Sequence, residues 1–161
     1  MSFLLIVGVL VVLCFGLAVL RGAPYLPTYG RDAEKLLDKC EIGPDSTLLD
    51  LGSGDGKVLM AAAKRGMHAV GYEINPLLWL MSKLRLMPYR KLVKIHLGDM
   101  WQADIGKSDV IFVFLLDRLM SDLEAKLAKE AKPGAVVISY VFKLPNKKPH
   151  QKTHNTYIYK F

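Results

Sequence analysis

Residues 46–66 hold an apolar run, a turn with three glycines and a helical pattern, in that order. Ser46 to Leu51 predicts a buried strand, and Gly52 to Gly56 predicts a turn, because glycine accepts backbone angles that other residues avoid. Apolar residues at helical spacing begin at Val58 and end at Gly66, which is typical of a helix terminus. A buried strand that leads through a turn into a helix is the first half of a β-α-β unit.

The rest of the chain continues this alternation of strands and helices. Further strands are predicted over residues 68–72, 92–97, 110–116, 136–142 and 156–159, and helices over residues 31–40, 76–86 and from 121 to the Pro133 stop. Asn75 is expected to cap the second of these helices, and Ser121-Asp122-Leu123-Glu124 predicts a capping box on the last. The fold class is therefore α/β, with a Rossmann-like, mostly parallel sheet of about six strands.

The first segment of the chain is a candidate membrane anchor. Ser2 to Leu20 contains no charged residue, and a helix of this length extends about 28 Å, close to the hydrocarbon thickness of a bilayer. A cleaved signal peptide would need a basic start and a small-residue exit, and a buried core helix would be shorter and carry a polar side. We therefore expect one transmembrane helix at residues 1–21, a linker at 22–30 and a globular domain at 31–161.

Composition excludes two other classes of protein and gives an expected location. A content of 52% hydrophobic residues is too high for a disordered chain, and two cysteines are too few for a secreted disulfide scaffold. Arg21 and Arg31 follow the apolar segment, and no basic side chain precedes it. The positive-inside tendency then predicts a single-pass membrane protein whose domain lies on the cytoplasmic, or an equivalent reducing, side.

The net charge of +7 is concentrated in two stretches. Residues 74–98 and residues 140–161 each hold five basic side chains and no acidic one. For a domain tethered to a bilayer, anionic headgroups are the nearest partner, at about 1 kcal/mol for each basic residue at the surface. The alternative is a solvated face that keeps the protein soluble. Nucleic acid is not an expected partner, because interleaved aromatics and a known binding motif are absent from the sequence.

An acidic residue stands at the end of each of the first four predicted strands of the domain: Asp50, Glu73, Asp99 and Asp117. Open parallel sheets bind ligands at the carboxyl ends of their strands, so these carboxylates predict a site for a ligand with hydroxyl or amino groups. The dinucleotide fingerprint fails, because it requires a glycine where Lys57 stands. No metal is expected, since His150 and His154 stand four residues apart without a cysteine or clustered carboxylates.

The nine residues Leu48-Leu49-Asp50-Leu51-Gly52-Ser53-Gly54-Asp55-Gly56 resemble the first motif of class I S-adenosylmethionine-dependent methyltransferases. The spacing to Glu73 and to Gly98-Asp99 is similar to that family's. More narrowly, residues 24–28, 50–56, 71–76 and 119–127 resemble membrane-anchored protein-lysine methyltransferases, the group that includes the ATP synthase c-subunit and adenine nucleotide translocase enzymes. The resemblance covers about residues 24–161. It implies S-adenosyl-L-methionine as cofactor and protein-lysine N-methyltransferase activity.

The same resemblance implies a role for the matching residues. Gly52 and Gly54 would let the backbone approach the methionine part of the cofactor, which a Cβ would obstruct. Asp50 and Asp55 would lie near its ammonium group. Glu73 would accept from both ribose hydroxyls in charge-assisted hydrogen bonds.

The other end of the cofactor would meet the residues after the third strand. Asp99 would accept from the adenine amino group, with Met100 and Trp101 beside the ring, and Thr28 in the linker would close over the cofactor. The complete set expected at the cofactor is Thr28, Asp50, Gly52, Ser53, Gly54, Asp55, Gly56, Glu73, Asn75, Asp99, Met100 and Trp101.

The implied reaction needs a neutral amine. A lysine with a reference pKa near 10.4 costs about 4.6 kcal/mol to deprotonate at pH 7, and a dry pocket next to a sulfonium lowers that cost. Asp117 is expected to orient the amine or to receive its proton through water, unless it only caps the helix that follows. The expected substrate is a membrane-associated protein with a target lysine. The alternatives are a lipid-soluble small molecule as acceptor, or a cofactor-binding pseudoenzyme that serves as a membrane adaptor.

Overall fold

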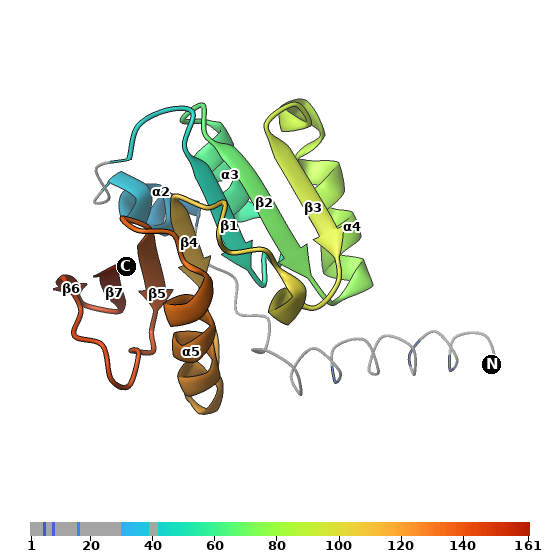
Figure 1. Ribbon diagram of the computed structural model, residues 1–161. Helices are drawn as coiled ribbons and strands as arrows, with labels where there is room; N and C mark the ends of the chain where they lie inside the picture. The colour runs from blue at the N-terminus through green and yellow to red at the C-terminus, as the bar shows by residue number, and fades with distance from the viewer. Residues whose placement is uncertain (1–4, 6–7, 9–15, 17–29, 39–41) are drawn as a thin grey trace.

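The computed structural model describes residues 30–38 and 42–161, together with Leu5, Gly8 and Gly16. A seven-stranded sheet in the order β3-β2-β1-β4-β5-β7-β6 forms its centre (Figure 1). The strands are β1 (Thr47–Leu51), β2 (His68–Glu73), β3 (Val93–Leu97), β4 (Val110–Val113), β5 (Val136–Tyr140), β6 (Gln151–Thr153) and β7 (Thr156–Lys160). The first five strands are parallel, whereas β7 runs antiparallel to both β5 and β6.

Helices cover both faces of this sheet. The α-helices are α2 (Gly30–Asp38), α3 (Lys57–Ala63), α4 (Pro76–Arg85) and α5 (Met120–Glu130), and the short 3₁₀ turns are η1 (Met87–Tyr89), η2 (Met100–Gln102) and η3 (Asp117–Leu119). Leu36 and Leu37 of α2 pack with α3 against Leu48 and Phe112 on one face. On the other face α5 packs against the alternate residues of the same strands, and Figure 1 shows α3 and α5 on opposite sides.

The burial of the central strands follows from their position. Strands β1 and β4 have helices on both faces, so every residue in them except Thr47 is buried, and every buried one except Asp50 is apolar. Asn75 caps α4 as predicted: its side-chain oxygen accepts from the backbone N–H of Leu77 at 2.9 Å, and Pro76 occupies the first helical position.

Two predictions about local structure are wrong. The sheet has seven strands rather than about six, because Gln151–Thr153 pairs with β7 across a two-residue turn. The capping box at Ser121 does not form either. Helix α5 already begins at Met120, directly after η3, and the Glu124 carboxylate accepts from the backbone N–H of Asn146 at 3.0 Å instead.

The predicted anchor at residues 1–21 lies outside the described residues except at Leu5, Gly8 and Gly16, and so does most of the predicted linker. Gly30, which was assigned to that linker, is the first residue of α2. Among the residues that the structure describes, no helix is long and apolar enough to cross a membrane.

Candidate functional site

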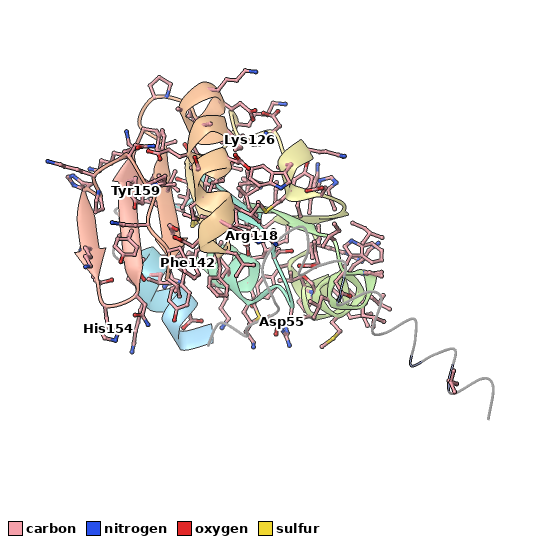
Figure 2. The ribbon with its side chains drawn as sticks, turned by 90° about the horizontal axis from the view of Figure 1, so that it is seen from below. Asp55, Arg118, Lys126, Phe142, His154 and Tyr159 are labelled. Carbon is pink, nitrogen blue, oxygen red and sulfur yellow. The ribbon has the colours of Figure 1, made fainter. Side chains whose placement is uncertain are left out.

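The candidate site lies at the carboxyl ends of β1 and β2. Asp50 of β1 stands beside Gly71 of β2 in the parallel register, and Glu73 lies two residues farther along on the same face. This is the face that α3 covers. Figure 2 views the molecule from below, so the carboxyl ends of the parallel strands point toward the viewer, and Asp55 lies on the opposite side of the sheet from α5 and its Lys126.

The glycine turn after β1 is hydrogen-bonded to the end of β2. The backbone N–H groups of Gly52 and Ser53 both donate to the carbonyl oxygen of Tyr72, at 3.0 and 2.9 Å. Gly52 has a φ of 98°, and open space surrounds the place where its Cβ would stand. No side chain covers the backbone at this point of the turn, so a ligand is able to approach it closely.

Gly71 has a packing role that the sequence prediction missed. A Cβ at this position would lie 2.6 Å from the Leu59 Cδ1 atom and 2.9 Å from the Ser53 Cβ atom. The absent side chain thus allows the turn and α3 to pack directly on β2, next to Asp50. The only sequence signal is a glycine within an otherwise regular strand, which marks a close approach of another segment.

Glu73 is held in place by two backbone donors. The N–H of Gly54 donates to Oε2 and the N–H of Asn75 donates to Oε1, both at 2.8 Å. The side chain is buried, and burial raises its pKa above the usual range even though these hydrogen bonds act in the opposite direction. A carboxylate has about four acceptor positions, so Glu73 keeps capacity to accept a hydrogen bond from a ligand.

Asp50 is the most strongly perturbed acid of the site. Only 2% of the residue is exposed. Burial raises its pKa to about 8, and the charges of Glu73 and Asp55 act in the same direction. At neutral pH the carboxyl is therefore mainly protonated, and a cation placed next to it would favour its ionised form.

Asp55 has partners of its own within the chain. Its carboxylate forms ion pairs with Arg85 at 2.5 Å and with Lys57 at 3.0 Å. Burial raises the pKa of Asp55, but the hydrogen bonds and charges of Arg85 and Lys57 outweigh burial and hold it below its usual value. Arg85 also donates to the Asp55 backbone oxygen at 2.6 Å, so it ties the turn to the end of α4. Sequence reasoning missed Arg85, because the two residues stand 30 positions apart.

Three buried polar side-chain atoms beside the turn have no hydrogen-bond partner among the described residues. They are Ser53 Oγ, Asn75 Nδ2 and Ser82 Oγ, the last of which lies next to Gly56. Buried polar groups in folded proteins are almost always satisfied by protein, water or ligand. Ser53 Oγ lies 2.9 Å from the place where a Cβ of Gly71 would stand, so this hydroxyl faces the packing of the turn on β2.

The end of β3 adds a third segment to the site. The N–H of Gly98 donates to the Glu73 backbone oxygen at 3.0 Å, which brings the Gly98-Asp99 pair next to the end of β2. Asp99 caps η2, where its carboxylate accepts from the Trp101 N–H at 3.1 Å. Met100 is buried and Trp101 is half-buried. Thr28 lies outside the described residues.

The ends of β4 and β5 differ from those of β1 to β3. Asp117 is exposed and is the first residue of η3. Phe114 and Tyr140 lie one residue beyond the last registered residue pair of β4 and β5. Their rings form an edge-to-face aromatic pair with centroids 5.7 Å apart. Both rings are partly exposed. The sequence prediction did not include this pair.

A family model described as the ANTKMT methyltransferase domain matches residues 50–151. The chain belongs to this family. It is 35% identical over 136 residues to the ATP synthase c-subunit lysine N-methyltransferase of Rattus norvegicus, and the match covers 81% of this chain and 61% of that protein. It is 30% identical over 148 residues to a protein-lysine N-methyltransferase of Saccharolobus islandicus, covering 84% of this chain and 92% of the relative. The chain thus spans about three-fifths of the rat relative's length.

Solved structures agree with this family. An RNA methyltransferase from Salinibacter ruber in complex with S-adenosyl-L-homocysteine has a TM-score of 0.79 and 27% sequence identity, over 84% of this chain and 93% of that chain. The recognition of a class I S-adenosylmethionine-dependent methyltransferase domain is therefore confirmed, and S-adenosyl-L-methionine is its cofactor. Its lysine methyltransferase relatives fit the more specific resemblance to that group.

The residues present fit this cofactor. The remaining acceptor capacity of Glu73 suits the ribose hydroxyls, and the uncovered backbone at Gly52 leaves room for the methionine part. The buried carboxyl of Asp50 suits a cationic neighbour. The charge of Asp55, by contrast, is already compensated by ion pairs with Lys57 and Arg85, and these ion pairs stabilise the turn.

Proposed function

We propose that this protein is a membrane-anchored, S-adenosylmethionine-dependent protein-lysine N-methyltransferase that acts on a membrane-associated protein. The observation that carries the transferase part is the buried Glu73 carboxylate, aligned by two backbone donors next to a bare glycine turn. The lysine acceptor is supported by relatives: the similar proteins with 30% identity or more bear names of lysine N-methyltransferases, from Rattus norvegicus to Saccharolobus islandicus.

When bound, S-adenosylmethionine would supply an activated methyl group: the lone pair of a neutral amine would form the new N–C bond as the S–C bond breaks, with the neutral thioether as leaving group and the surplus amine proton passing to solvent. The chain contributes mainly alignment, and proximity of this kind supplies much of an enzyme's acceleration. Glu73 would accept from the ribose hydroxyls and hold one end of the donor. The uncovered backbone at Gly52 would admit the methionine part, and the Asp50 carboxyl would lose its proton and present a negative charge to the ammonium group.

The acceptor amine approaches from the ends of β4 and β5 in this proposal. The partly exposed rings of Phe114 and Tyr140 offer π faces, which attract a cationic lysine or its methylated product at about 0.5–2 kcal/mol. Apolar walls also favour the neutral amine over the ammonium. In this proposal Asp117, which is exposed at the start of η3, orients the amine or receives its proton through water.

Membrane attachment is proposed from the sequence. The uncharged Ser2–Leu20 segment has the length and composition of a bilayer span, and Arg21 and Arg31 predict a domain on the cytoplasmic or an equivalent reducing side. A membrane-associated substrate agrees with this tether. A relative of Mus musculus, 36% identical over 131 residues, is named adenine nucleotide translocase lysine N-methyltransferase.

Transfer of a labelled methyl group tests the acceptor. The full-length chain is incubated with membranes from its host and with S-adenosylmethionine labelled in the methyl group, and the protein, lipid and RNA fractions are separated. We expect the label in protein, on lysine after hydrolysis. Label confined to lipid would assign the small-molecule activity, and label confined to RNA would assign a nucleic acid acceptor; either result refutes the lysine proposal.

A matched pair of variants ties the label to this chain. Glu73→Gln keeps the size of the side chain but loses its charge, so labelling should fall to background. Glu130→Gln removes a carboxylate of α5 that pairs with Lys126, far from the glycine turn, and should leave labelling unchanged. Cofactor binding without any labelled fraction would assign the pseudoenzyme alternative.

A further inference from the structure

The outer side of α4 carries an apolar stripe on the surface of the domain. Residues 77, 80, 81 and 84 are spaced by three and four, so they lie along one face of the helix, and residue 87 of η1 continues the row. Their exposed fractions are large: Leu77 41%, Leu80 48%, Met81 51%, Leu84 58% and Met87 57%. The opposite face of α4, with Leu78 and Ser82, is buried.

Basic side chains and a hollow adjoin this stripe. Between α4 and β3 lies a cavity of about 650 Å³, whose lining includes Lys83, Arg90 and Lys94. All three are exposed. Trp79 also lines the cavity; its indole N–H donates to the Ile95 carbonyl at 3.3 Å, and the Lys83 ammonium lies 4.7 Å from the ring centroid. Residues 74–98 contain no acidic side chain that would offset these charges.

We propose that this surface, the α4 stripe with Lys83, Arg90 and Lys94, is a membrane-contact surface that rests on an anionic bilayer. A helix with leucine and methionine on one side and bases beside them lies in the plane of a bilayer interface, with its apolar side among the upper acyl chains. Each basic residue near an anionic surface adds to the attraction. The inference rests on the proposed membrane location of the protein, but it does not require the Ser2–Leu20 segment to span the bilayer.

Charge favours lipid over a second copy of the chain. A symmetric dimer through this surface would bring the same bases of two copies together, and like charges at an interface are unfavourable. An anionic bilayer offers both partners at once: headgroups for the bases and acyl chains for the stripe. The N-terminal apolar segment offers no charge to Lys83, Arg90 or Lys94, since its residues 2–20 are uncharged.

The placement also links this surface to the candidate site. Helix α4 is capped by Asn75, whose N–H donates to Glu73, and it ends at Arg85, which pairs with Asp55. Figure 1 shows α4 at the β3 edge of the domain, away from β6 and β7. A bilayer in contact with α4 therefore contacts a helix that is linked to Glu73 at its start and to the glycine turn at its end.

Tryptophan fluorescence quenching by brominated lipids tests the proposal on the full-length chain. The chain has two tryptophans, so Trp101→Phe leaves Trp79 as the sole reporter and Trp79→Phe leaves Trp101. The probes are phosphatidylcholine vesicles with and without phosphatidylserine, brominated near the headgroup end of the acyl chains. We expect Trp79 to be quenched several-fold more in the anionic vesicles and Trp101 to be quenched equally little in both.

Charge reversal supplies the matched control. The combined substitutions Lys83→Glu, Arg90→Glu and Lys94→Glu should lower the association constant of this surface for the anionic bilayer at least about 100-fold. They should also abolish the quenching of Trp79. The same reversal at Lys143, Lys148 and Lys160, which are exposed in the other basic stretch, should leave the quenching unchanged. Equal loss in both triple variants would show a general charge effect and would refute the proposed surface.

Flotation of the same vesicles keeps the two membrane proposals apart. A chain that floats in all vesicles while Trp79 is never quenched retains its anchor and refutes the α4 surface. A chain that floats only with phosphatidylserine and shows quenching of Trp79 refutes the anchor and supports the surface. Concentration-dependent dimers in detergent, with Trp79 shielded from lipid in every vesicle, would assign the surface to a second copy and overturn the proposal.

Discussion

The carboxyl ends of the strands form two unlike halves. In the half formed by β1 to β3, the acids Asp50 and Glu73 are buried, and backbone donors or neighbouring charges act on both. In the half formed by β4 and β5, Asp117 is exposed and the most prominent contact is the Phe114–Tyr140 ring pair. The first half is preorganised in the absence of a ligand, whereas the second half is open and largely apolar.

This difference agrees with what each half has to recognise in the proposed function. A nucleoside cofactor is small and constant, so rigid and desolvated groups are able to match it. A lysine on a membrane-associated protein brings its own surroundings, and the substrate and the bilayer complete the site around it. Substitutions in the first half should therefore change cofactor binding and stability, and substitutions in the second half should change turnover.

Asp50→Asn tests the first half with the largest expected effect. The folded-state pKa of Asp50 is about 8, above its ordinary value of 3.8, so this carboxyl stabilises the fold fully only below pH 3.8 and loses that contribution as the pH rises toward 8. Removing the titrating group should stabilise the cofactor-free protein by on the order of 4 kcal/mol at pH 7 and by almost nothing at pH 3.5. Urea unfolding across this pH range measures the difference.

The cofactor should reduce this stability difference. A cation bound beside Asp50 favours the ionised carboxylate, so S-adenosylmethionine should stabilise the native chain more than the Asp50→Asn variant, and binding at pH 7 should release a proton. Calorimetry in buffers of different ionisation enthalpy counts that proton. A stability difference that does not change with pH would mean that Asp50 is ionised in the free protein.

Glu73→Gln should weaken cofactor binding by about 100-fold, because hydrogen bonds to a charged acceptor contribute about 1.5 kcal/mol each and two are proposed to the ribose. Isothermal titration with S-adenosylmethionine measures the dissociation constant, and Glu130→Gln provides the control. Retained affinity in Glu73→Gln would remove the carboxylate from the cofactor site.

Sequence patterns were sufficient for all five parallel strands, of which β1, β4 and β5 are mainly buried and mainly apolar. Asp50, Glu73 and Asp99 lie at or next to the ends of their strands as predicted, whereas Asp117 lies in η3, four residues beyond the end of β4. Strand β6 was missed because Gln151–Thr153 is a short, mainly exposed edge strand whose only pairing in the described sheet is with β7. Arg85 and Gly71 were missed for a related reason: their roles depend on contacts with distant residues, which no local pattern encodes.

Asp117→Asn tests the open half. We expect kcat to fall about tenfold while the dissociation constant of S-adenosylmethionine stays the same, since a single proton-handling group contributes about tenfold or more and Asp117 is proposed to act on the acceptor rather than on the cofactor. Steady-state methylation with a lysine-containing substrate and titration of the cofactor separate the two quantities. Asp122→Asn, also exposed and five residues farther along the chain, is the control. A weaker cofactor affinity in Asp117→Asn would show that this residue acts on the cofactor, and it would contradict the assignment of Asp117 to the acceptor half.

Val141→Gly has the smallest expected effect and tests whether the open half stores backbone strain. Val141 follows β5, is exposed and has a φ of 73°, which a β-branched side chain rarely adopts. Relief of backbone strain in the folded state should contribute about 1–3 kcal/mol. Glycine also raises the conformational entropy of the unfolded chain, which offsets about 1 kcal/mol. The expected net gain in the free energy of unfolding is about 1 kcal/mol. Val136→Gly, in the regular part of β5, should instead destabilise the protein. If both variants lose stability equally, the Val141 conformation is relaxed, and the contrast between the two halves reduces to burial and charge alone.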